Sequence, residues 1–165
     1  MTFNRPTLVC LVTPVSLLMG TAAFAQTAPA PYGAPMTIEQ AKKVMVAAEA
    51  EPRKNNWSVV ISIVDTGGHL VALQRLDAQI ASIDISIGKA TTAAAFRRPS
   101  KALEDGLAAC SARLRILTVR AATALQGGVP IVVDGIIIGG TGVPGVLASQ
   151  DELVAMAGTA AAAAK

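Results

Sequence analysis

His69 is the only histidine among the 165 residues, and it directly follows the pair Gly67-Gly68. A zinc site built from several histidines, or a haem held by two histidines of one chain, is therefore excluded. A single imidazole can still be an axial ligand of haem iron, or pair with its symmetry mate in an oligomer. The alternative is an ordinary turn histidine. In either case we expect His69 to be accessible at the mouth of a hairpin.

Basic side chains could hold an acidic ligand at two places. Lys89 is a lone cation in an Ala/Thr-rich helical stretch that includes Thr92, where a solvated or salt-bridged lysine is the default interpretation. Farther along, the basic residues are Arg97, Arg98, Lys101, Arg113, Arg115 and Arg120, against only Glu104 and Asp105. Such a patch suits a small acidic ligand, haem propionates among them, although a solvated helix face is the commoner explanation.

Two glycine-containing motifs resemble nucleotide-binding loops but lack the required context. Gly140-Thr-Gly-Val-Pro-Gly145 matches G-x-G-x-x-G, yet the preceding strand belongs to a hairpin and Pro144 removes an amide donor. What remains is a loop that could receive an anion or allow a tight backbone contact. Gly88-Lys-Ala-Thr-Thr92 follows no strand and has Ile83 where a P-loop has its first glycine, so we exclude a nucleoside triphosphatase.

The composition excludes further classes of protein. Charged residues make up 15% of the chain and apolar residues 52%, and this balance excludes intrinsic disorder for most of the chain. The net charge of +3 and the 3% aromatic content argue against a nucleic-acid partner. No acid/base pair of carboxylates and no nucleophile elbow is recognisable by spacing, so the sequence assigns no catalytic residue.

Residues 1–25 have the parts of a secretory signal peptide. Arg5 supplies the positive charge, Leu8 to Met19 is apolar, and Ala23-Phe-Ala25 has the small residues that a signal peptidase requires. A membrane anchor is the alternative, but Pro14 and Gly20 interrupt the apolar stretch. Cleavage predicts a periplasmic or secreted protein with no stable membrane insertion.

Cleavage also determines what cysteine chemistry we expect. Cys10 leaves with the signal peptide, so Cys110 is alone and no internal disulfide can form. Cys110 lies in an Ala-rich helical context, and we interpret it as a small buried hydrophobe rather than a reactive thiol.

Hydrophobic patterns predict helix, hairpin, helices, hairpin and helix in that order. A flexible leader over residues 26–35 precedes a domain over residues 36–163. The hairpins cover residues 57–76 and 131–138, and the Asp134-Gly135 pair fits the type I′ turn of the second. Two helices are expected to follow capping boxes, Thr37-Ile-Glu-Gln40 and Ser149-Gln-Asp-Glu152. A third is expected from Ser82 or Asp84 to Arg98, and a short fourth begins after Ser100 as its cap. Residues 113–125 are ambiguous.

This order of elements indicates an α+β fold with helices on an antiparallel sheet. The strands Ile131-Val-Val and Ile136-Ile-Ile lack polar alternation, so both of their faces should be covered. A domain with so few charges and so much aliphatic surface is also expected to bury part of that surface against copies of itself.

A series of motifs resembles the GlcG/HbpS-like haem-binding group, which also supplies the C-terminal domain of PduO-type corrinoid adenosyltransferases. The resemblance covers about residues 36–158, and its most specific part is Gln126-Gly-Gly-Val-Pro130 followed by Asp134-Gly135. The other matching motifs are Val64-Asp-x-Gly-Gly-His-Leu-Val-Ala72, Arg75-x-Asp77, Lys89-Ala90, Phe96-Arg-Arg98, Ile138-Gly-Gly140, Gly142-Val143 and Gln150-Asp-Glu152.

The resemblance implies a profilin-like fold with a central antiparallel β-sheet flanked by helices, and a homo-oligomer such as an octamer. For some members it also implies haem binding, and haem degradation with iron release. Carried onto this chain, it makes His69 the first candidate for contact with haem iron. Lys89, Thr92 and the glycine loop belong to the same expected neighbourhood, and Arg97 and Arg98 are the expected partners of the propionates. Any degradation would be oxidant-driven chemistry of the iron.

Two other functions stay open at this point. A small carbonyl or hydroxy-acid substrate could bind near Lys89 and Asp134, with Lys89 polarising it. Alternatively, the protein could be an accessory module that only assembles with a partner. Pro144 stands where a serine is common in the resembled group, which argues against a hydroxyl contact from this loop.

Overall fold

Four antiparallel strands form a single sheet in the order β2-β1-β4-β3. A computed structural model describes residues 28–109 and 111–163; the expected signal peptide and Cys110 lie outside the described residues. The elements are α1 (Ile38–Asn55), β1 (Val60–Asp65), β2 (Leu70–Arg75), α2 (Ser82–Phe96), α3 (Lys101–Ala109), the 3₁₀ helix η1 (Ser111–Thr118), β3 (Gly128–Val133), β4 (Ile136–Gly142) and α4 (Ala148–Ala162). The α+β class and both hairpins are therefore confirmed.

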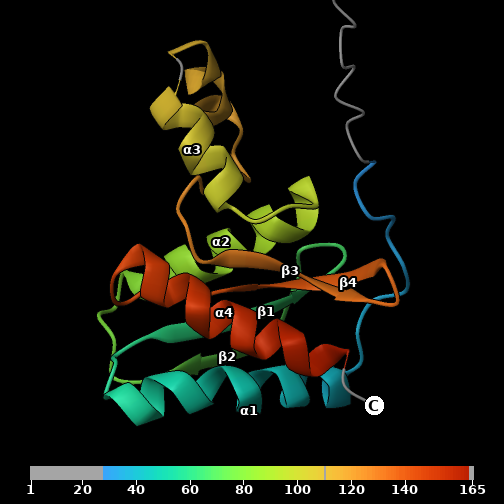
Figure 1. Cartoon of the computed structure of the whole chain (residues 1–165), viewed down its shortest axis with the longest axis vertical. Coiled ribbons are helices and arrows are strands. Elements are labelled where there is room, and N and C mark those ends of the chain that lie inside the picture. The colour runs from blue at the N-terminus through green and yellow to red at the C-terminus, as the bar shows by residue number, and fades with distance from the viewer. Residues whose placement is uncertain (1–27, 110, 164–165) are drawn as a thin grey trace, which may run out of the picture.

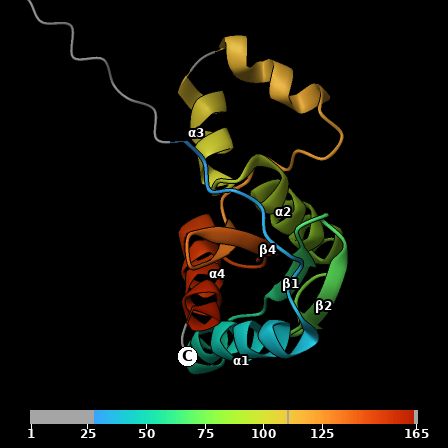
Figure 2. The ribbon, with the colours of Figure 1, turned by 90° about the vertical axis from the view of Figure 1, so that its right-hand side faces the viewer.

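Helices cover both faces of this sheet (Figures 1 and 2). The paired helices α1 and α4 bury one face, and the core between them and the sheet includes Val44, Ile61, Ile63 and Val154. Helix α2 lies across the other face, where Ala90 and Ala94 pack on Val64. The sheet thus has a thick apolar layer on one side and a single helix of small residues on the other. No helix of the described residues is long and apolar enough to span a bilayer.

Local sequence signals set most helix ends. Thr37 and Gln40 form the predicted capping box, since Thr37 Oγ1 accepts from the Gln40 N–H at 3.2 Å and Gln40 Oε1 accepts from the Thr37 N–H at 2.8 Å. The second predicted capping box is wrong. Helix α4 begins at Ala148, before Ser149, and Gln150 Oε1 accepts from the Leu147 N–H at 3.2 Å. The Gln150 N–H in turn donates to the Leu147 carbonyl at 2.8 Å, so Leu147 and not Ser149 is the N-cap residue.

The segment before α1 is attached to the domain. The sequence predicts a flexible leader up to Pro35, but the Gly33 N–H donates to the Ile137 carbonyl at 2.9 Å and the Ile137 N–H donates to the Pro31 carbonyl at 2.9 Å. The Tyr32 hydroxyl also lies 2.9 Å from the carbonyls of Ala94 and Ala95 at the end of α2. Residues 31–33 therefore continue the sheet beside β4, beyond the end of β1.

Helix α3 and η1 project from the body as a separate lobe (Figures 1 and 2). The sequence leaves residues 113–125 ambiguous, and the structure places the first part of them in η1. Ser100 stands before α3 as predicted, but its hydroxyl does not cap the helix. It donates to the Leu125 carbonyl at 2.5 Å and accepts from the Gly128 N–H at 2.8 Å, so it holds the returning chain to the body.

Candidate functional site

The turn between β1 and β2 is organised by a single carboxylate. Asp65 Oδ1 accepts from the Gly67 N–H at 2.8 Å and from the His69 N–H at 2.9 Å. Gly68 adopts φ +80°, which a residue with a side chain rarely adopts. This geometry directs His69 outward: its side chain is 83% exposed, and its Nδ1 lies 3.4 Å from Asp65 Oδ1. The expectation of an accessible histidine at a hairpin turn is confirmed.

The turn also shifts the acidity of Asp65. Partial burial raises the pKa of the carboxyl. Hydrogen bonds from the His69 and Gly67 backbone, together with the nearby imidazole, lower it by a larger amount, so the net pKa lies below its usual value. Asp65 is thus an ionised acceptor beside the imidazole. A carboxylate next to Nδ1 favours a proton there and leaves Nε2 as the nitrogen able to bind a metal.

We expect the turn to open in acid as Asp65 is protonated. A carboxyl whose pKa is lower in the folded chain stabilises the fold above the unfolded-state pKa of 3.8, and this stability is lost as the pH falls through the folded-state pKa. In an NMR titration, the Gly67 and His69 amide resonances should move together with a midpoint below 3.8. Asp65→Asn should abolish that transition. A midpoint at or above the usual value would contradict the assigned hydrogen bonds.

Helix α2 supports the turn from behind. Thr91 Oγ1 donates to the Gly68 carbonyl at 3.3 Å. Ile87 lies one helical turn before Thr91 and is partly exposed. Leu70, the next residue after His69, is 49% exposed. Two apolar side chains, Leu70 and Ile87, are therefore at least partly exposed in the elements that hold the turn.

Lys89 and Thr92 point away from solvent. The Lys89 side chain is 4% exposed, and its Nζ donates to the Val143 carbonyl at 2.8 Å and to Asp151 Oδ2 at 3.0 Å. The Thr92 hydroxyl donates to the Ala121 carbonyl at 3.0 Å and accepts from the Thr123 N–H at 2.7 Å. Both polar groups therefore form hydrogen bonds within the chain. The structure therefore does not bring these two side chains together with the His69 imidazole.

Arg97 and Arg98 lie directly after α2, which ends at Phe96. Arg97 takes φ +55° where the helix ends, and its guanidinium lies 5.5 Å from the centre of the Tyr32 ring. Arg98 is exposed, and its Nε donates to the Phe96 carbonyl at 3.1 Å. Arg97 comes six positions after Thr91, which corresponds to a rise of about 9 Å along α2.

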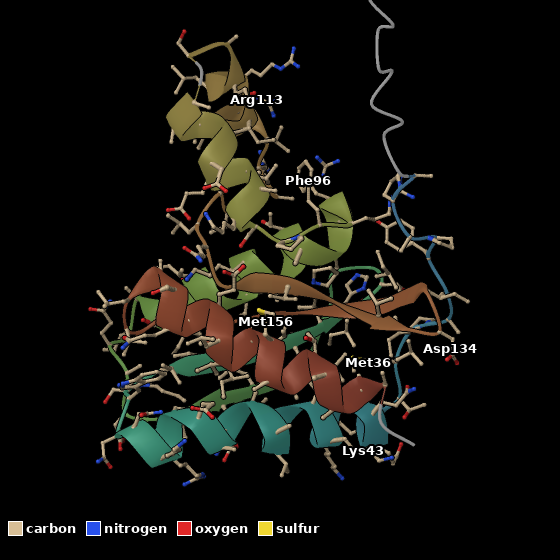
Figure 3. The ribbon with its side chains drawn as sticks, in the orientation of Figure 1. Met36, Lys43, Phe96, Arg113, Asp134 and Met156 are labelled. Atoms are coloured by element: carbon tan, nitrogen blue, oxygen red, sulfur yellow. The ribbon has the colours of Figure 1, made fainter. Side chains whose placement is uncertain are left out.

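The remaining sequence candidates are spread over the molecule. Arg113 and Arg115 line a cavity of about 430 Å³ inside the projecting lobe, and Figure 3 shows Arg113 there, far from Asp134 at the tip of the β3–β4 hairpin. Lys89 contacts Val143, just past the opposite end of β4 from Asp134. The strand between them is seven residues long, a span of about 20 Å. Lys89 and Asp134 therefore do not form one site.

Sequence reasoning missed three residues of the observed arrangement. The sequence alone places Asp65 only within the first hairpin, Asp151 at the start of a helix and Tyr32 in the leader. The signal for Asp65 was available locally, because an aspartate before Thr-Gly-Gly commonly accepts from the following backbone amides. The contacts of Asp151 and Tyr32 join segments 62 residues apart and have no local signal.

Comparison with known proteins identifies the family to which this chain belongs. Residues 36–160 match a family model described as haem degrading protein HbpS-like. The protein belongs to the HbpS-like family. This HbpS-like chain is 46% identical to the protein GlcG of Escherichia coli K12 over 110 residues, which cover 66% of the chain and 80% of GlcG. The relationship predicted from the sequence motifs is confirmed.

Solved structures share the fold of the HbpS-like chain. A double mutant of Streptomyces reticuli HbpS superposes with a TM-score of 0.71 at 26% identity, covering 94% of this chain and 97% of that one. A structure described as a PduOC:heme complex superposes with a TM-score of 0.69 at 28% identity, covering 77% and 94%. The antiparallel sheet flanked by helices is thus the fold of the family.

Proposed function

We propose that this protein binds haem, with His69 as the axial ligand of the iron. The observation that carries the proposal is the imidazole that Asp65 holds outward, 83% exposed, in a chain of the HbpS-like family. A neutral imidazole with one nitrogen facing a carboxylate and the other free is the usual arrangement of a metal-binding histidine. A homologous fold occurs in a structure described as a PduOC:heme complex, which supports the same ligand class here.

The surroundings of His69 suit a porphyrin in part. Leu70 and Ile87 offer apolar surface to the macrocycle, and Arg97 and Arg98 offer guanidinium groups to the propionates. Bound haem would supply redox-active iron, and degradation would then be driven by an external oxidant. The residues of this chain would hold the group and keep water from one side of it.

A single copy leaves His69 too open to enclose a macrocycle, so the proposal includes a homo-oligomer. No side chain of α3 or of η1 is buried. Leu114 and Leu117 in the lobe are 51% and 63% exposed. Apolar side chains in such an extension favour cover by another copy. We further propose export to the periplasm or beyond, on the sequence of residues 1–25.

The alternative, an enzyme that acts on a small carbonyl or hydroxy-acid substrate, has less support. It requires Lys89 to meet the substrate, but Lys89 Nζ is buried against Asp151 and Val143. An accessory module without haem remains the second candidate, and it is distinguished by the titration below.

Titration of the mature chain with hemin tests the proposal. The wild type should give a saturable Soret band with a shifted maximum, and His69→Ala should lose that shift and bind at least about tenfold more weakly. Asp65→Asn should weaken binding by about tenfold, as for other partners of metal-binding histidines. Lys43→Gln, at an exposed position of α1, is the control and should match the wild type. An unchanged spectrum and affinity in His69→Ala would refute His69 as the ligand, and no band in the wild type would refute haem binding.

A further inference from the structure

A second cavity lies at the far end of the β1–β2 hairpin from His69. It has a volume of about 440 Å³ and is formed where α1 ends, β1 begins and β2 ends. Because β1 has six residues, about 20 Å separates this cavity from the His69 turn. The cavity is therefore a separate place from the proposed haem site. Its size is in the range of pockets that hold one small molecule.

The charges in this cavity are of both signs. Arg75 Nε donates to the Ala78 carbonyl at 2.7 Å, which holds the guanidinium in place. Among the residues that the structure describes, no carboxylate lies within 4.0 Å of Arg75, and no cation lies within that distance of Asp77. Each of these side chains can therefore still pair with a charged ligand group.

The second arginine of the cavity is already neutralised. Arg53 donates to Glu49 Oε2 from Nε at 2.9 Å and from Nη2 at 2.6 Å. With this pair closed, the charges left for a ligand are one guanidinium and one carboxylate. A simple anion would meet Asp77 as a like charge, and a simple cation would meet Arg75. A ligand with one charge of each sign satisfies both.

Apolar groups complete the lining. Trp57 and Leu76 are half-buried, pack against the main core and line the cavity. Their position is thus fixed by the fold, and they offer a ligand an apolar surface. Pro52 of α1 adds to it. The motif Arg75-x-Asp77 had no role in the proposed haem site, and here both of its charged residues lie together.

We propose that this cavity binds a free amino acid with an apolar side chain. The carboxylate of the ligand pairs with Arg75, its ammonium group pairs with Asp77, and its side chain lies against Trp57 and Leu76. Binding at this site does not depend on haem, so its test is independent of the proposed function.

Fluorescence of Trp57 tests this proposal directly, because Trp57 is the only tryptophan in the chain. The probes are L-leucine, 4-methylpentanoate, which lacks the amine, and 3-methylbutylamine, which lacks the carboxylate. We expect a saturable change with L-leucine, and binding at least about tenfold weaker for either analogue, since each loses one charged contact. No saturable change with L-leucine, or equal affinity for 4-methylpentanoate, would overturn the proposal.

Two variants assign the charges. Asp77→Asn keeps a residue that tolerates the φ of +53° at this position, so the fold should be preserved. It should weaken the binding of L-leucine by at least about tenfold and should strengthen that of 4-methylpentanoate, which no longer meets a like charge. Arg75→Gln should weaken both ligands, and a variant that binds both as the wild type does would overturn the proposal. Lys43→Gln, at an exposed position of α1 outside the cavity lining, should change neither. An Asp77→Asn variant that binds L-leucine as the wild type does would remove the ammonium contact and with it the proposal.

Discussion

Replacing Lys89 by alanine is expected to lower the free energy of unfolding by about 3–5 kcal/mol, the range found when one partner of a buried ion pair is removed. The side chains of Lys89 and Asp151 are 4% and 5% exposed, and 3.0 Å separates Nζ from Oδ2. Without Lys89, a carboxylate stays buried, and its one remaining donor within the described part of the chain is the Val146 N–H, at 3.1 Å. The Val143 carbonyl also loses its lysine contact. Urea denaturation at neutral pH measures the loss.

The pH dependence of this loss identifies its cause. Burial raises the pKa of the Asp151 carboxyl. The Lys89 ammonium and the hydrogen bond from the Val146 N–H lower it by less, so the net pKa lies above its usual value. A carboxyl whose pKa is higher in the folded chain favours the fold when protonated, and that contribution is lost as the pH rises through the folded-state pKa. Removing Lys89 removes one of the opposing influences, so the stability deficit of Lys89→Ala should be largest at neutral pH and shrink in acid.

A double variant provides the control. Lys89→Met with Asp151→Asn removes both charges while keeping a side-chain oxygen that can accept from the Val146 N–H. It should recover more than half of the stability lost by Lys89→Ala. A loss below about 1 kcal/mol in the single variant, as for an exposed pair, would contradict the buried arrangement. The same burial explains why Lys89 is a poor candidate for a ligand contact, although the sequence presents it as a lone cation.

The parts of this structure that the sequence predicted depend on residues close together in the chain. The type I′ turn needs positive φ at two adjacent positions, and Asp134 and Gly135 adopt φ of +51° and +76°. The capping box of α1 joins Thr37 to Gln40, three residues apart. His69 is also positioned locally, by the hydrogen bond that its backbone N–H donates to Asp65 Oδ1 within the same turn. Local chemistry was sufficient for these features.

The parts that the sequence did not predict depend on packing between distant segments. Nothing near Lys89 indicates that α2 buries it beneath the start of α4, where Asp151 lies. Pro29, Pro31 and Pro35 favour a flexible leader by composition, and only the free edge of β4 beyond β1 provides Gly33 and Tyr32 with partners. Arg97 likewise lies against Tyr32 because that edge brings the leader to the end of α2.

The close approach of α2 to β4 leads to the second large expected effect, from Gly142→Ala. A methyl group at Gly142 would overlap the Ser86 carbonyl oxygen and the Ala90 nitrogen and lie 3.0 Å from Lys89 Cβ. The first two are backbone atoms of α2, so relief requires the whole helix to move from the sheet. Such a shift would also strain the 2.5 Å contact between the Ser62 and Ser86 hydroxyls. We expect a loss of about 3 kcal/mol or more in unfolding free energy, at the upper end for overpacked cores.

Gly106→Ala makes the same chemical change where the obstacle can move. The nearest atom to its added methyl group is Cδ of Arg113 at 2.9 Å, part of a flexible and exposed side chain. Alanine is favoured over glycine inside a helix, so this variant should gain up to about 1 kcal/mol. Opposite signs for the two substitutions would show that backbone contact between α2 and β4 causes the loss. Helix α2 also carries Thr91, which contacts Gly68 behind His69. Gly142→Ala should therefore weaken hemin binding as well, whereas Gly106→Ala should leave hemin binding unchanged. Similar losses of stability and of hemin affinity in both variants would contradict this account.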